Sequence, residues 1–112
     1  MTGAAQRLAA ERAGTEARVA ALRRDFDAIA SSSSAGADDE HDPEGSSTAF
    51  ERQHVAALLE QAEGQLAEIA RAEARLEDGS YGRCERCGRP IAAERLAARP
   101  AAATCIACAS RR

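Results

Sequence analysis

Four cysteines near the C-terminus are the residues of this chain best suited to chemistry. They form two C-x-x-C pairs, Cys84 with Cys87 and Cys105 with Cys108, and seventeen residues separate the pairs. Two such pairs at this distance can fold back on each other and place four thiolates tetrahedrally around one zinc ion. Four thiolates leave no coordination position for water, so we expect the zinc to be structural and no residue to be catalytic.

Two other uses of the cysteines have to be weighed against zinc. Structural disulfides need an oxidising compartment, and the residues after Met1 contain neither the apolar core of a signal peptide nor a membrane-spanning run. We therefore expect a cytoplasmic protein with reduced thiols and no membrane contact. A redox-active C-x-x-C would precede a helix in a βαβ unit, and no such unit is visible in the sequence. Zinc is the favoured interpretation.

The charge of the chain is divided unevenly. Residues 1–78 hold sixteen acids and eight arginines, a net charge of -8, whereas residues 79–112 hold two acids and seven arginines, a net charge of +5. A zinc ion with four thiolates would add a formal charge of about -2 to the basic end. Because the acidic part would repel phosphates, we expect no direct DNA binding.

Two alanine-rich segments carry the apolar spacing of amphipathic helices. The first spans about residues 4–30, with seam positions Leu8, Arg12, Thr15, Val19, Leu22, Phe26 and Ile29. The second spans about residues 48–78, with seam positions Val55, Leu59, Ala62, Leu66, Ile69, Glu73 and Leu76. Thr48 and Glu51 have the spacing of a capping box at the start of the second helix. Gly79 follows its last residue.

The segment between the predicted helices, about residues 31–47, is polar. It contains a run of four serines and then five acids among the seven residues 38–44. We therefore predict a mainly α fold: an antiparallel two-helix coiled-coil hairpin over residues 1–78, followed by a small C-terminal four-cysteine zinc finger over residues 79–112. An intermolecular coiled coil is the alternative. The finger is too small to fold on Ile91 and Leu96 alone, so metal binding should stabilise it.

The residues around the cysteines form a specific pattern. They run YGRCERCGRPI at 81–91, ERLAARP at 94–100 and CIAC at 105–108. This pattern of about 28 residues closely resembles the DksA/TraR family of bacterial proteins, and the predicted hairpin with its acidic tip agrees with it. The resemblance implies a transcription regulator that binds RNA polymerase and inserts its helical arm into the secondary channel.

In that family the tip of the arm carries two aspartates in the pattern D-x-x-D-x-A and lies near the catalytic magnesium. Asp39 and Asp42 match the two aspartates, Glu40 lies between them, and Glu44 stands at the alanine position. The resemblance therefore implies an effector tip made of these four residues, with a charge at one position where the family has none.

Several family members act together with the alarmone ppGpp, and the match to that site is incomplete. Arg99 matches one basic position of the family, whereas Glu68 and Ala109 fall where two others are expected. We therefore expect no strong ppGpp dependence. Arg95 and Arg99 are either polymerase contacts or ordinary surface charges.

Other classes of function remain as alternatives. One is a zinc-finger protein that binds nucleic acid and dimerises through its helices, and another is a structural adapter. We expect no enzymatic activity, because the cysteines are occupied by zinc and the serine run has no plausible histidine partner. His41 and His54 are expected to be solvated.

Overall fold

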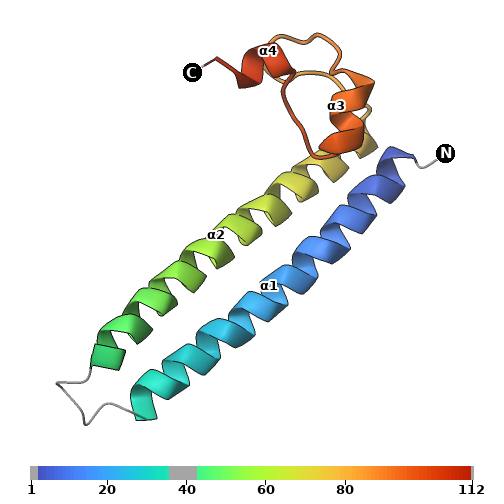
Figure 1. Ribbon diagram of the computed structural model, residues 1–112. Helices are drawn as coiled ribbons and strands as arrows, with labels where there is room; N and C mark the ends of the chain where they lie inside the picture. Colours follow the sequence, from blue (N-terminus) through green and yellow to red (C-terminus); the bar gives the residue numbers. More distant parts are fainter. Residues whose placement is uncertain (1–2, 36–42, 112) are drawn as a thin grey trace. The chain divides into compact units, whose positions relative to one another are not determined.

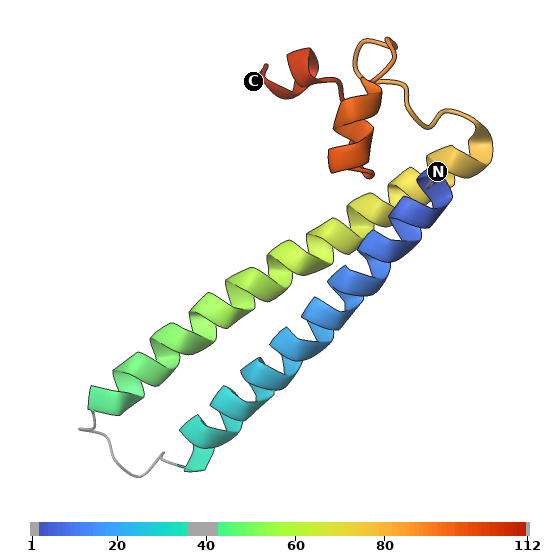
Figure 2. The same ribbon diagram turned by 45° about the vertical axis from the view of Figure 1, so that its right-hand side comes forward.

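The computed structural model describes the backbone of residues 3–35 and 43–111, with side chains for all of these except 32–35 and 43–46. It contains helices α1 (Ala4–Ala35), α2 (Pro43–Asp78), α3 (Ala93–Ala98) and α4 (Ile106–Ala109). The described residues form no strand, only an isolated bridge between Arg83 and Pro90. The long helices α1 and α2 run antiparallel, and the short helices follow them in the chain (Figure 1; Figure 2). The predicted fold class is confirmed.

Both long helices extend further toward the connecting segment than the sequence predicts. Helix α1 continues through the serine run to Ala35, and α2 begins at Pro43 rather than near Thr48. A serine in a helix costs only about 0.5 kcal/mol relative to alanine, so a serine run next to an established helix can remain helical. Proline suits the first position of a helix because its fixed φ is already helical and it has no N–H to leave unpaired.

Helix α2 ends at Asp78, and Gly79 follows it. Gly79 has φ of +85°, a left-handed conformation that glycine adopts without the clash of a side chain. The backbone N–H groups of Ser80 and Tyr81 donate to the carbonyl of Arg75, at 2.9 and 3.1 Å. These bonds satisfy the end of the helix and turn the chain toward the cysteines.

The described residues group into two compact units, and each unit contains part of both long helices. The first unit comprises residues 1–14 and 65–112, and the second comprises residues 15–64. In the first unit the buried side chains Leu8, Ile69 and Ala72 form a cluster, and Tyr81 and Ala101 pack against it. The cysteine-rich segment thus shares a core with the helix ends beside it, and the division of the chain into a hairpin over residues 1–78 and a finger over residues 79–112 stays a prediction.

The hydrophobic seam is thin, as expected for two helices rich in alanine. Every predicted seam position is buried or half-buried. In the second unit Val19 and Ala62 are buried, and Arg23 pairs with Glu63 across the helices at 3.1 Å. None of the described helices combines the length and the apolar content needed to cross a bilayer.

The two charged interruptions of the seam face each other. Arg12 of α1 and Glu73 of α2 form an ion pair. The Nε of Arg12 donates to both carboxylate oxygens of Glu73 at 3.2 Å, and the Nη2 of Arg12 donates to Oε1 of Glu73. Hydrogen bonding from Arg12 lowers the pKa of Glu73. A polar pair inside an apolar seam favours one register of the helices, because any shift would leave each charge among apolar side chains.

We predict that Glu73→Gln lowers the free energy of unfolding of the zinc-loaded protein by about 1 kcal/mol or less at neutral pH, because both partners are about one-third exposed. The lowered pKa means that this contribution is present above the ordinary pKa of a glutamate and is lost as pH falls through the folded-state value. Urea unfolding followed by circular dichroism should therefore show a smaller difference between the two proteins in acid.

Glu77→Gln is the matched control, because Glu77 is an exposed acid outside the seam of the same helix. Equal stability of Glu73→Gln and the unmodified protein at neutral pH, or an equal loss in Glu77→Gln, would contradict the role of the ion pair.

Candidate metal centre

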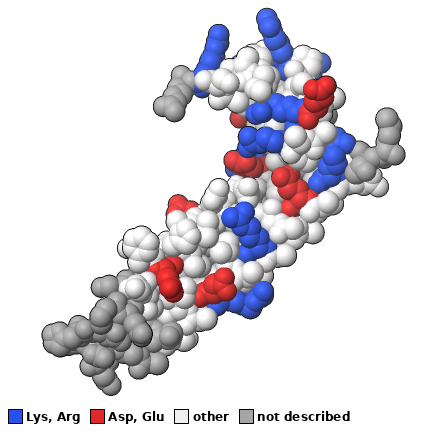
Figure 3. Space-filling model, in the orientation of Figure 1, with Lys and Arg blue, Asp and Glu red and all other residues white. Residues whose placement is uncertain are grey.

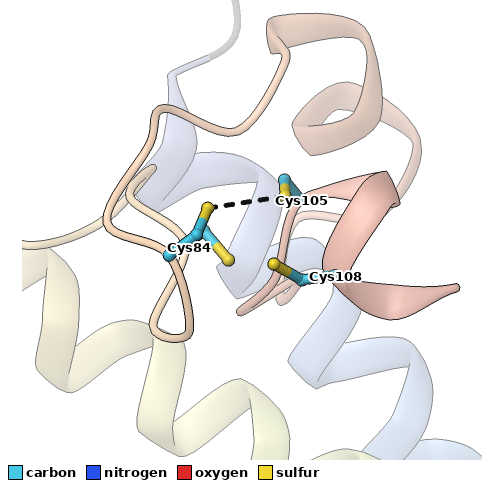
Figure 4. Close-up of side chains that lie close together, drawn as sticks. Cys84, Cys105 and Cys108 are labelled. Atoms are coloured by element: carbon cyan, nitrogen blue, oxygen red, sulfur yellow. Dashed lines mark hydrogen bonds between the residues drawn. The ribbon is translucent and has the colours of Figure 1, made fainter. Parts of the chain in front are cut away.

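The four cysteines of the two C-x-x-C pairs meet at one point. Their Sγ atoms all lie within 4.8 Å of one another. Cys84 and Cys108 are buried, Cys105 is half-buried and Cys87 is exposed. Figure 4 shows the thiol groups of Cys84, Cys105 and Cys108 turned toward a common centre from two separate loops. The structure therefore brings together all four predicted metal ligands.

The first C-x-x-C loop is held by backbone hydrogen bonds around Cys84. The N–H of Cys84 donates to the carbonyl of Arg89 at 2.8 Å, and the N–H of Gly88 donates to the carbonyl of Cys84 at 2.9 Å. Gly88, the residue after Cys87, has φ of +74°, a left-handed backbone conformation that residues with a side chain rarely adopt. This tight turn directs both thiols to the same side.

The second C-x-x-C loop forms the start of a helix. Cys105 is the N-cap of α4, and its carbonyl accepts from the N–H of Ala109 at 2.9 Å. Two hydrogen bonds tie this part of the chain to the first loop: the N–H of Glu85 donates to the carbonyl of Ala103 at 2.9 Å, and Arg86 Nη1 donates to the carbonyl of Cys108 at 3.0 Å. Residues far apart in sequence are thereby held at the distance that a shared metal requires.

The rest of the segment forms a small cover for the cluster. Ile91 and Leu96 are buried with Cys84 and Cys108, and Tyr81 packs against them. The hydroxyl of Tyr81 donates to the carbonyl of Pro100 at 2.8 Å. Arg95 donates from Nε to the carbonyl of Thr104 at 2.9 Å, so this arginine supports the loop that leads to Cys105.

The protonation of the thiols reflects their crowding. Burial alone would disfavour the thiolate of Cys84, but hydrogen bonds from backbone N–H groups, among them that of Cys105, outweigh it and lower the pKa of Cys84 to about 6. The backbone N–H of Cys108 lowers the pKa of Cys105. Hydrogen bonding with the Cys105 sulfur, followed by burial, raises the pKa of Cys108 to about 12. A zinc ion bound at the centre would replace the remaining thiol protons, because it stabilises all four thiolates.

The sulfur geometry fits zinc and does not fit disulfides. The Sγ atoms of Cys87 and Cys105 are 3.8 Å apart. Zinc–sulfur bonds of about 2.3 Å in a tetrahedron place neighbouring sulfurs about 3.8 Å apart, whereas a disulfide would bring them to about 2.05 Å. An all-sulfur tetrahedral donor set is typical of zinc. The site can hold one zinc ion, and its four protein ligands fill the coordination shell, as a structural site requires.

The other predicted site residues have different outcomes. Asp39, Glu40 and Asp42 lie outside the described residues, and Glu44 lies in the first turn of α2 without a described side chain. The tip assignment therefore stays a prediction. Arg99 is exposed, and Arg95 is half-buried.

A polar cavity of about 310 Å³ adjoins the metal centre within the first unit, and sequence reasoning did not identify it as a cavity. Its charged lining residues are Glu11, Glu68, Arg71, Arg75, Glu85, Arg95 and Arg99. The Nη2 atom of Arg75 is buried and has no hydrogen-bond partner among the described residues. The four-residue spacing of Arg71 and Arg75 on α2 was the available signal, since such residues lie on one helix face.

We predict that reduced protein, isolated without added metal, contains about one zinc ion per chain, and that Cys108→Ser loses most of it. Elemental analysis by mass spectrometry measures this content. Acid should release the metal, because protonation of the thiolates competes with zinc. The loss should change far-UV circular dichroism little, since α3 and α4 contain only six and four residues.

Ser110→Ala is the control for this experiment, because Ser110 adjoins the same loop without being a ligand. Reduced protein without zinc, or Cys108→Ser with a full complement of it, would refute the four-thiolate site.

Comparisons with known proteins agree with this geometry. Residues 79–112 match the family model described as the prokaryotic dksA/traR C4-type zinc finger. Among solved structures, the chain resembles that of the transcription factor DksA2 from Pseudomonas aeruginosa, with 27% sequence identity and a TM-score of 0.57. The match covers 93% of this chain and 81% of the DksA2 chain. The search of curated protein sequences finds no match.

The family model covers the cysteine-rich segment, and the structural match extends over the helical hairpin as well. The chain thus carries a C4 zinc finger of the dksA/traR type on a DksA-like fold.

Proposed function

We propose that this protein is a bacterial transcription regulator that binds RNA polymerase in the cytoplasm. The observation that carries the proposal is the combination of a dksA/traR-type finger with a DksA-like helical hairpin in one chain. The solved structure that it resembles is that of a transcription factor. A closed metal site and an arm of two helices suit a protein that acts by binding rather than by catalysis.

The proposed mode of action is insertion of the hairpin into the secondary channel of the polymerase. Helices of 32 and 36 residues have contour lengths of about 50 Å at 1.5 Å per residue, which suits a narrow channel. Asp39 and Asp42, with Glu40 and Glu44 beside them, would bring negative charge toward the catalytic magnesium ion.

The zinc finger would anchor the base of the arm. Tyr81 and Ala101 pack against Leu8 and Ile69, so the finger and the adjoining helix ends share one hydrophobic cluster. On the face shown in Figure 3, arginines crowd the C-terminal segment, whereas both signs of charge occur along the helices. The basic finger would therefore face acidic protein surface on the polymerase.

Binding of nucleic acid through the finger is the main alternative, because residues 79–112 carry a net charge of +5. Three of the arginines in this segment bond to backbone carbonyls of the finger itself: Arg83, Arg86 and Arg95. This engagement reduces the number available for phosphates. Retention on DNA without polymerase, weakening steeply with salt, would favour this alternative over the proposal.

We predict that the protein co-purifies with the RNA polymerase of its host and changes transcription in vitro, and that Asp39→Asn with Asp42→Asn removes most of that change. The double variant removes the two charges that would reach the active site, while the finger remains intact. Glu60→Gln with Glu77→Gln removes the same charge from exposed positions of α2 and should act like the unmodified protein. No binding to polymerase would refute the proposal.

We also predict that ppGpp changes the effect of the protein on transcription little. Glu68, which takes a basic position of the family pattern, lines the cavity beside the metal centre together with Glu11 and Glu85. The three carboxylates offset the four arginines of the same lining to a net charge of +1, which attracts a highly charged phosphate ligand only weakly. Transcription with and without the nucleotide tests this expectation, and strong synergy would contradict it.

A further inference from the structure

Phe50 is the most exposed large hydrophobic residue among those the structure describes. Its exposed fraction is 76%, and Ile106, the other exposed large hydrophobic residue, has an exposed fraction of 71%. A single exposed apolar side chain is common on protein surfaces and needs no partner. Phe50 differs because it shares a helix face with His54, which lines a groove.

That groove lies in the second compact unit and has a volume of about 330 Å³. Ala28 and Ile29 of α1 and Val55 of α2 form its apolar part. Phe50 lies one residue before Glu51 and four residues before His54, both of which line the groove. Residues four apart share a helix face, so Phe50 extends the apolar surface at the edge of the groove. We call these residues and Phe50 the Phe50 groove.

Two carboxylates flank the apolar part of the Phe50 groove. Asp25 of α1 and Glu51 of α2 line it, and both side chains are exposed. Neither has an ion-pair or hydrogen-bond partner among the residues that the structure describes. An apolar recess between unpaired carboxylates is complementary to an apolar side chain next to a cationic one.

The charge of this unit also decides between occupants. Residues 15–64 contain eleven acids and four arginines, a net charge of -7. Two copies of a unit with this net charge would repel each other, and the unit would also repel a nucleic acid. The favoured occupant is therefore a protein segment with positive charge.

We propose that the Phe50 groove docks a segment of RNA polymerase that presents an apolar side chain beside an arginine or lysine. This inference rests on the proposed function and adds to it a contact on the sides of the helices, separate from the acidic tip and from the zinc finger. Phe50 supplies a rigid aromatic contact of the kind that dominates binding energy at interfaces, and the carboxylates orient the cationic partner.

The test is a binding titration of the zinc-loaded, fluorescently labelled protein with the RNA polymerase of its host. Phe50→Ala should raise Kd about tenfold or more. Alanine is a stronger helix former than phenylalanine, so the exposed helix should persist, and circular dichroism can check it. Gln61→Ala, which truncates an exposed side chain of the same helix outside the groove, should leave Kd within about twofold.

A second pair of variants tests the charged edge of the groove. Glu51→Gln should weaken binding about twofold to threefold at low salt and make Kd less dependent on salt, because it removes a charge from the rim of the contact. Glu60→Gln removes a charge from an exposed position of the same helix outside the groove and should change neither quantity.

The outcomes separate the inference from the proposed function. Polymerase binding that Phe50→Ala leaves unchanged, or that Gln61→Ala weakens equally, overturns the inference alone. So does a concentration-dependent dimer that Phe50→Ala abolishes, because a second copy would then occupy the groove. Failure of the unmodified protein to bind polymerase refutes the proposed function and the inference with it.

Discussion

Four thiolates held close together repel one another, and the C-terminal segment depends on a metal ion that offsets this repulsion. Thiolates crowded within 4.8 Å of one another need a cation between them. The buried hydrophobic cluster of this segment has four members, of which Cys84 and Cys108 are metal ligands and the other two are Ile91 and Leu96. So small a core cannot order thirty residues, so zinc binding and folding are coupled here. The hydrogen bonds between the two loops align the sulfurs but do not remove their repulsion.

The order that the metal imposes extends into the long helices. Tyr81 contacts both the cluster around the cysteines and the cluster around Leu8 and Ile69. The ends of α1 and α2 in this unit are thereby linked to the finger. The helices also depend on a thin hydrophobic seam, in which the pairing of Arg12 with Glu73 favours the native register. A thin seam leaves most of the surface of both helices exposed to solvent, and such a surface suits a protein that works through contacts along its length.

The parts of this structure that follow periodic rules were predictable from the sequence. The 3.5-residue repeat marked each seam position, and the C-x-x-C spacing marked the ligands. The Arg12–Glu73 pair was not predictable, because each residue alone interrupts its seam. Only the register of the two helices brings together these residues, which are 61 positions apart in sequence. The helix through the serine run was also missed, since local propensity is weak against continuation of a helix. The cavity near Arg75 and the groove near Phe50 arise from residues of different elements, which a linear pattern does not reveal.

Zinc K-edge X-ray absorption of the purified, reduced protein tests the central claim most directly, because it reports the identity and distance of the atoms bound to the metal. A zinc ion held by the four cysteines should show one shell of four sulfur atoms at about 2.3 Å with no nitrogen or oxygen ligand. A shell containing nitrogen or oxygen would show that the four cysteines do not close the site by themselves. The metal would then have an open or shared position, and the finger could no longer be regarded as a purely structural anchor.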